Sequence, residues 1–340
     1  MFPKIFSKCL LFILVLIFSF DLAAKDPIKL QQAELGESVK IAKDAGLLGA
    51  DEDFVVQGVK RFDGWFLKAN RLVFEPGSQL IFSQEAQNRR NSFFVVAREI
   101  VIKDQNSPGL ITWERGSSPV VSDNPGQAGT GAHAQNDDLP GGPGNPGQPG
   151  QPGHSGKDAP NLTVFVLSPP TSALTIDFKG QDGGKGGKGQ KGGDGGNGAK
   201  GHPASAALVG CKRGAGNGGD GGSGGSGGIG GVGGRGGTGG SVMLVSLADR
   251  LPTITQHFRV LVTGGDGGVG GDGGNGGNGG QGGSGGQEAR PNCVGDGSSG
   301  NPGAQGPNGP EGPKGIAGLE GDLFVGILTE QQFKDHIFGR

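Results

Sequence analysis

The sequence has few cysteines, few aromatic residues and no tyrosine. Of its 340 residues, 3 are cysteine, 2 are tryptophan and 2 are methionine, and apolar residues make up only 32%. A conventional hydrophobic core is excluded for most of the chain, because too little apolar surface is present to bury. Something other than side-chain burial has to order the larger part of the protein.

Long hydrophobic runs are also missing, since no apolar stretch reaches the roughly 20 residues that a membrane-spanning helix needs. The longest one, residues 9–20, follows two lysines and precedes two alanines, which is the pattern of a secretory signal peptide. We expect residues 1–24 to be removed. The mature protein is then secreted, held at the cell surface or periplasmic, without membrane insertion.

An excess of charge of either sign is absent as well. The 30 basic and 32 acidic residues give a formal net charge of −2. Because no polybasic face stands out, we expect no nucleic-acid partner. The two cysteines that remain after signal-peptide removal are few enough for one disulfide in an oxidising compartment.

Catalytic and ligand-binding motifs do not stand out from the glycine-rich background. GxGxxG patterns recur by composition alone, and no Gly-Lys pair is followed by the Ser or Thr of a phosphate-binding loop. The five histidines lack the spacing of a metal site. We therefore expect no enzyme activity, no cofactor and no metal site.

Glycine is abundant, at 77 residues, and much of it is periodic. Three tracts repeat the pattern Gly-Gly-x with a period of three: 182–201, 214–240 and 264–286. In a left-handed extended helix with three residues per turn, such a tract has one edge of side chains and two edges of bare glycine. The period predicts polyglycine II rods that pack closely and form hydrogen bonds between their backbones.

Two further tracts, 141–156 and 297–321, have the collagen-like form Gly-x-y with several prolines. One interpretation is a triple helix made by three chains. The other places these tracts as outer rods of an intramolecular bundle, where no neighbour needs the N–H that proline lacks. The tracts are short and interrupted, so a monomer is favoured and a trimer is the alternative.

Short apolar, β-branched runs between the glycine tracts predict strands. They are 72–74, 80–82, 93–97, 100–102, 110–113, 162–167, 174–178, 242–247, 257–262 and 323–328. Asn161, Ser241 and Asp322 open such runs at spacings of 80 and 81 residues. Each unit thus consists of a strand, a loop, a second strand, a rod, a tip and a returning rod.

The predicted fold class is mostly β plus polyglycine II. Short stacked strands form a β-sandwich or β-helix-like base, and hairpins of glycine-rich extended helices pack on it as a bundle. The predicted domains are an amino-terminal β-rich domain, 25–120, and a glycine-rich repeat domain, 121–340.

The tips are the stretches where the triplet pattern stops, at 132–140, 202–213 and 287–294. Cys211 and Cys293 lie in two of them, so a disulfide between them would clamp the far end of neighbouring hairpins. Other candidate binding residues at the tips are His133, Asp137, Asp138, His202, Lys212, Arg213, Arg290 and Asn292. Loops on a rigid scaffold are common binding sites.

From about residue 127 to 321, the triplet tracts resemble the polyglycine II bundles of the snow flea antifreeze protein and of some phage tail-fibre adhesins. Strands alternating with glycine-rich hairpins are similar to the amino-terminal Obg domain. The two proline-containing tracts resemble collagen-like bacterial surface proteins. These resemblances imply a backbone geometry and transfer no function by themselves.

The predicted function is that of an exported, non-catalytic structural or adhesive surface protein, which presents binding loops to a cell-surface or glycan partner. One alternative is a secreted carbohydrate-active enzyme of the β-helix type. That enzyme would need a cleft with clustered acidic residues in the strand region. Another alternative is a collagen-like trimeric surface stalk.

Overall fold

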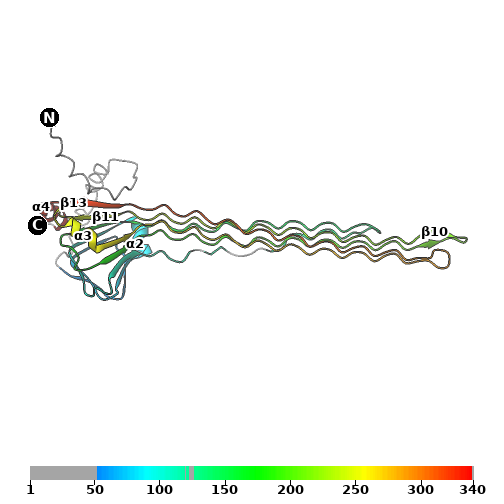
Figure 1. Ribbon diagram of the computed structural model, residues 1–340, viewed down its shortest axis with the longest axis horizontal. Helices are drawn as coiled ribbons and strands as arrows, with labels where there is room; N and C mark the ends of the chain where they lie inside the picture. The colour runs from blue at the N-terminus through cyan, green and yellow to red at the C-terminus, as the bar shows by residue number, and fades with distance from the viewer. Residues whose placement is uncertain (1–51, 119, 122–125, 339–340) are drawn as a thin grey trace, which may run out of the picture.

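The computed structural model describes residues 52–118, 120–121 and 126–338. The predicted signal peptide, residues 1–24, lies outside the described residues. Figure 1 shows a head made of strands and a long, narrow arm that projects from it. The strand β10 (Cys211–Arg213) marks the far end of the arm.

The head contains two sheets whose neighbouring strands are parallel. The first sheet has the order β1-β3-β5-β7-β11-β13, and the second has the order β12-β8-β6-β4-β2. The strands of the first sheet are β1 (Phe54–Val56), β3 (Phe66–Phe74), β5 (Ser92–Ile102), β7 (Asn161–Val166), β11 (Val242–Ser246) and β13 (Leu323–Ile327). Those of the second are β2 (Val59–Phe62), β4 (Gln79–Phe82), β6 (Gly109–Trp113), β8 (Leu174–Asp177) and β12 (Phe258–Leu261). The chain alternates between the two sheets.

The glycine-rich excursions return the chain in register. Val242 of β11 lies opposite Leu162 of β7 on one side and opposite Leu323 of β13 on the other. Equivalent positions are therefore 80 and 81 residues apart, which is the repeat that the sequence predicted. Since each unit brings the chain back in the same direction, neighbouring strands are parallel.

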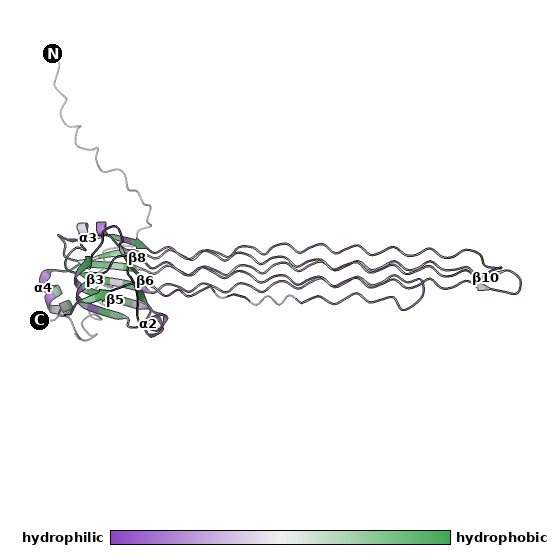
Figure 2. Ribbon diagram, turned by 90° about the horizontal axis from the view of Figure 1, so that it is seen from below, coloured by the Kyte–Doolittle hydropathy of each residue, from purple (hydrophilic) through white to green (hydrophobic). Residues whose placement is uncertain are grey.

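The main core lies between the sheets. In β4, Leu80 and Phe82 point inward and are fully buried, whereas Gln79 and Ile81 alternate with them and are only partly buried. The ring of Phe82 stacks on that of Phe93 in β5, with centroids 4.4 Å apart. Aromatic and branched residues with a period of two thus build the head, whose strands are the hydrophobic part of Figure 2.

The outer face of the six-stranded sheet is covered by the C-terminal segment. α4 (Glu330–Gln332) and the π-helical η1 (Phe333–Phe338) place Phe333 and Ile337 in one buried cluster with Phe165 of β7. β7 and β11 are therefore buried on both faces. This explains why both strands are continuous apolar runs in the sequence.

The predicted fold class is wrong. The regular secondary structure is two large parallel sheets of six and five strands with few helices, as in folds of the α/β type, and the glycine-rich tracts form neither helix nor strand. The other helices are α2 (Gln84–Arg89) and α3 (Leu251–His257). Strands that are joined by hairpins in a β-sandwich would be antiparallel. Here the chain runs through every strand of a sheet in the same direction, so neighbouring strands are parallel.

The two sheets also continue across residue 120. β5 pairs with β7 and β6 pairs with β8, so strands on both sides of that position share the same sheets. The base of the arm is consequently continuous with both sheets of the head.

Candidate functional site: the arm and its tip

The arm consists of six extended segments that run between the head and the tips. The outgoing segments are 126–137, 179–201 and 263–286, and the returning segments are 141–160, 214–240 and 297–321. Segments that run in one direction bond side by side, and each also bonds to segments that run in the other direction. The arm is thus two layers of three segments, with antiparallel contacts between the layers.

The central returning segment, 214–240, bonds to four others. One backbone hydrogen bond per triplet joins it to each neighbour; examples are Gly231 N–H to Gly187 O (2.8 Å), Gly271 N–H to Gly231 O (2.8 Å), Gly230 N–H to Pro310 O (3.0 Å) and Gly150 N–H to Ile229 O (2.9 Å). Backbone polar groups that would need water in an isolated extended chain are therefore paired within the arm.

Glycine occupies the positions where neighbouring backbones meet. A Cβ on Gly231 would overlap the carbonyl oxygen of Gln151, and a Cβ on Gly230 would overlap that of Gly271. The third residue of the triplet, Val232, is 40% exposed. The inner segments therefore tolerate a side chain only at every third position.

The two proline-containing segments, 141–160 and 297–321, lie on outer sides of the arm and have one glycine per triplet. Most of their non-glycine residues are exposed, so side chains fit there. Pro307, Pro310 and Pro313 accept N–H groups of the central segment through their carbonyl oxygens, at 2.9, 3.0 and 2.9 Å. The collagen-like tracts thus form their hydrogen bonds within one chain.

Asp and Asn side chains accept hydrogen bonds from N–H groups that have no backbone carbonyl partner. Asp194 accepts the N–H of Asn278 at 2.8 Å in one layer, and Asp220 accepts the N–H of Asn301 at 2.6 Å in the other. Such charge-assisted bonds tie adjacent segments together at the side-chain edge.

Where the central segment carries apolar side chains, prolines take the place of the residues that would donate such an N–H. The side chains of Ile229 and Val232 cannot accept a hydrogen bond. In the neighbouring segment, the residues opposite them are Pro310 and Pro313, as Asn301 is opposite Asp220. Proline has no N–H, so no donor is left unpaired there. The polar and apolar positions of one segment are thus matched to the residues of the next.

The pKa values of two carboxylates of the arm, Asp194 and Asp138, are lowered by hydrogen bonds from backbone N–H groups. The pKa of Asp194 lies below its ordinary value chiefly because the carboxylate accepts the N–H of Asn278, and Lys191, 3.3 Å away, adds to the effect. The pKa of Asp138 is lowered chiefly by the backbone N–H of His202. Hydrogen bonds to a charged carboxylate favour that charged form.

We expect the arm to lose stability below about pH 4. Because the folded pKa values of Asp138 and Asp194 lie below 3.8, their contribution is present above that pH and is lost as the pH falls through the folded values. Calorimetry from neutral to strongly acidic pH would measure it. Asp194→Asn keeps an oxygen acceptor and should weaken the dependence of stability on pH. If this variant loses as much stability at acidic pH as the wild type, the assignment to Asp194 is wrong.

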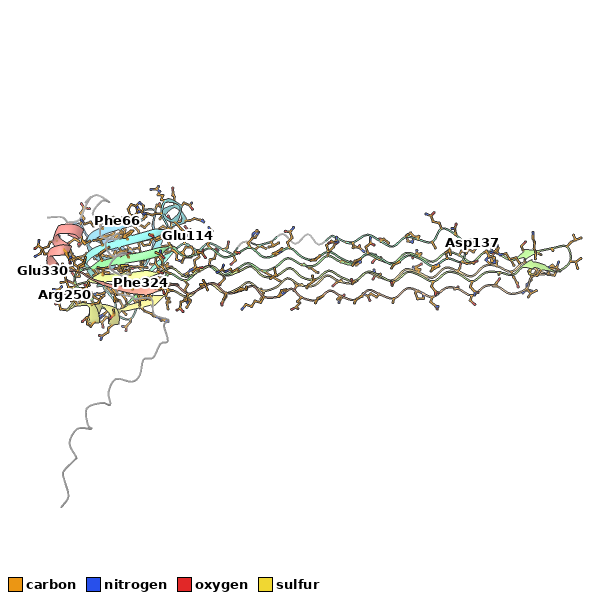
Figure 3. All side chains as sticks on the ribbon, turned by 90° about the horizontal axis from the view of Figure 1, so that it is seen from above. Phe66, Glu114, Asp137, Arg250, Phe324 and Glu330 are labelled. Atoms are coloured by element: carbon orange, nitrogen blue, oxygen red, sulfur yellow. A yellow bond between two sulfur atoms is a disulfide. The ribbon has the colours of Figure 1, made fainter. Side chains whose placement is uncertain are left out.

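The tip of the first hairpin folds back onto the neighbouring outgoing segment. His133 Nδ1 accepts the N–H of Asn197 at 2.8 Å. Asp138, in the left-handed region at φ 66°, accepts the backbone N–H of His202 at 3.0 Å and also contacts His202 Nδ1. Three of the predicted site residues therefore hold this hairpin to the arm. Asp137 is exposed on the same turn, toward the far end of the arm (Figure 3).

The second and third tips together form the far end. β9 (Ser205–Ala206) pairs antiparallel with β10, and a disulfide joins Cys211 of β10 to Cys293, with the Cα atoms 4.8 Å apart. Asn292 Nδ2 donates to the carbonyl oxygen of Ala207 at 3.0 Å. The predicted disulfide is confirmed, and Asn292 provides a second link between these tips.

The three predicted cationic residues lie around this disulfide. The Arg213 side chain is 60% exposed and lies 3.9 Å from the carboxylate of Asp138. Arg290, 74% exposed, contacts Glu288, and Lys212 is exposed. The structure thus brings Asp138, His202 and Arg213 together, while the other cations surround the far end.

Three apolar residues that were not predicted as site residues are also highly exposed at the far end. Leu208 is 100% exposed, Val209 is 92% exposed, and Val294 of the adjacent tip is 72% exposed. The signal in the sequence was an apolar pair inside a tip, where neither a strand nor a rod could bury it. The binding residues predicted at the tips are all polar or charged.

A shallow groove of about 470 Å³ lies on the five-stranded sheet. Its charged side chains pair with one another: Arg61 with Glu114 at 2.8 Å and Arg115 with Asp177 at 2.5 Å. Each carboxylate in the groove faces an arginine.

The described residues contain neither a metal-binding cluster nor a membrane-spanning helix. Within 52–118, 120–121 and 126–338, no group of three or more His, Cys, Asp or Glu residues could hold a metal ion. None of the helices in this part of the chain is long and apolar enough to cross a membrane. The Cys211–Cys293 disulfide is typical of an oxidising extracellular or periplasmic compartment.

No protein-family model and no curated protein matches this chain. Among solved structures, it is similar to the springtail antifreeze protein from Granisotoma rainieri, described as a nine polyproline type II helical bundle. The identity is 28%, the match covers 52% of this chain and 92% of that chain, and the TM-score is 0.09. A TM-score this low carries no argument about fold or function.

Proposed function

We propose that the protein is an exported structural or adhesive surface protein, with the arm as a spacer and the far end as the point of contact with a cell-surface or glycan partner. The observation that supports this proposal most is the exposure of Leu208 and Val209 on a disulfide-linked tip. Large apolar side chains that point into water at the end of a projecting element are typical of a contact surface.

The construction of the arm supports a spacer role. Each inner segment is hydrogen-bonded along its length to several neighbours, so bending the arm requires many bonds to break together. A stiff arm holds its end away from the head at a fixed distance. Binding loops on a preorganised support lose little entropy when they engage a partner.

The test measures attachment of the labelled protein to isolated cell envelopes and to immobilised glycans. We expect Leu208→Ser combined with Val209→Ser to reduce attachment at least about tenfold, because the apolar contact area is removed. Val269→Ser is a matched control, since Val269 is 60% exposed but lies on the shaft of the arm. Equal attachment of the tip variant and the control would overturn the proposal.

A further inference from the structure

The apex of the arm is an uncharged loop. Residues 203–210 carry no charged side chain, and Leu208 and Val209 stand at its outermost turn with nearly full exposure. Val294 of the adjacent tip adds a third exposed apolar side chain, at 72%. Three large apolar side chains are thus exposed to water in the two tips that the disulfide joins.

Cations follow directly behind this apex. Lys212 and Arg213 come after Cys211 in the chain, and Arg290 belongs to the neighbouring tip. Their charges are directed outward: the Arg290 side chain is 74% exposed, against 22% for its partner Glu288.

Two acidic residues that flank Cys293 in the sequence, Glu288 and Asp296, accept backbone N–H groups. Glu288 Oε2 accepts the N–H of Gly295 at 2.9 Å, and Asp296 Oδ1 accepts the N–H of Glu288 at 2.7 Å. The Arg213 side chain is 60% exposed, against 37% for the Asp138 carboxylate near it. Residues 203–213 and 287–297 contain three cations, Lys212, Arg213 and Arg290, and two carboxylates, both of which accept backbone N–H groups, so these two segments offer a partner more positive than negative charge.

The apex is also held in one arrangement. The disulfide joins the two tips, Asn292 Nδ2 bonds to the carbonyl oxygen of Ala207, and the N–H of Ala207 donates to Gly210 O at 3.0 Å. The apolar side chains therefore project from a fixed loop.

We propose that the apex docks onto the surface of an anionic lipid bilayer, an inference that rests on the proposed contact role of the far end. Leu208 and Val209 enter the interfacial region between the lipid headgroups, while Lys212, Arg213 and Arg290 lie at the level of the phosphates. An apolar apex followed by outward cations matches the order of layers in a bilayer, where apolar groups lie deeper than phosphates. The contact is peripheral and involves no membrane span.

The experiment is co-sedimentation of the mature full-length protein with vesicles of phosphatidylcholine, alone or mixed with phosphatidylglycerol. We expect binding to the mixed vesicles that weakens with salt, and much weaker binding to phosphatidylcholine alone. Leu208→Asp combined with Val209→Asp should reduce binding at least about 100-fold, because two apolar contacts are lost and two like-charged groups face the lipid. Lys212→Glu combined with Arg213→Glu should reduce it about tenfold or more.

Val269→Asp is the control for position, because it places one such aspartate on the shaft instead of the apex, and it should bind as the wild type does. Circular dichroism of every variant would show that the fold is kept. Absent binding of the wild type to mixed vesicles, or equal binding of the apex variant, overturns the lipid proposal. If attachment to envelopes still depends on Leu208 and Val209 in that case, the partner is a protein or glycan and the proposed function stands.

Discussion

Replacing Gly231 by alanine should destabilise the arm by about 3 kcal/mol, because the new Cβ overlaps a backbone oxygen that has no room to move. Gly231 lies in the central segment, where its N–H and its carbonyl are bonded to two different neighbours. A Cβ there would overlap the carbonyl oxygen of Gln151. Separating the two segments would weaken bonds in the adjacent triplets as well.

Thermal unfolding and hydrogen exchange would measure this effect. A loss of about 3 kcal/mol corresponds to a melting temperature lower by about 4 °C for a protein of this size. The control is Gly214→Ala, at the tip end of the same segment, where a Cβ meets no atom within 4 Å. If both variants melt together, the arm is not packed in solution as the structure has it.

Removing the disulfide should have the second large effect. Cys211 and Cys293 are 82 residues apart, and a closed loop of that length restricts the unfolded chain enough to contribute about 4 kcal/mol by the loop-entropy model. The double variant Cys211→Ser, Cys293→Ser should therefore melt about 6 °C lower. The loss should begin at the far end, where hydrogen exchange of residues 203–213 should rise first.

The wild type treated with a reductant provides the comparison. It should melt close to the double variant, whereas the reductant should leave the double variant unchanged. Equal melting of the oxidised wild type and the double variant would mean that the backbone bonds of the arm hold the tips together without the disulfide.

The sequence predicted the positions of most strands but not how they pair. Short apolar, β-branched runs located β4 and β6, and the spacing of Asn161, Ser241 and Asp322 gave the repeat. A local apolar run contains no information on the direction of the neighbouring strand, so the parallel sheets were not predicted. β2 was missed because its residues are largely exposed and charged.

At the candidate site as well, contacts between residues far apart in the sequence were the part that could not be predicted. The disulfide was predictable because each cysteine interrupts a triplet tract at an equivalent place. Asp138 and His202 were both selected, but their direct contact spans 64 residues and depends on how the first hairpin aligns with the second. Nothing in either local sequence sets that alignment.

The register of the arm also restricts which lengths the arm can have. Each segment is fixed at the head by a strand pairing, and the second and third hairpins are fixed at the far end by a disulfide. The reach of the protein can then change only in whole triplets, each at most roughly 10 Å, and only if every segment along that stretch changes by the same amount. Insertions of one or two residues would move glycines out of the backbone contacts, so variants of this protein should differ in length by discrete steps.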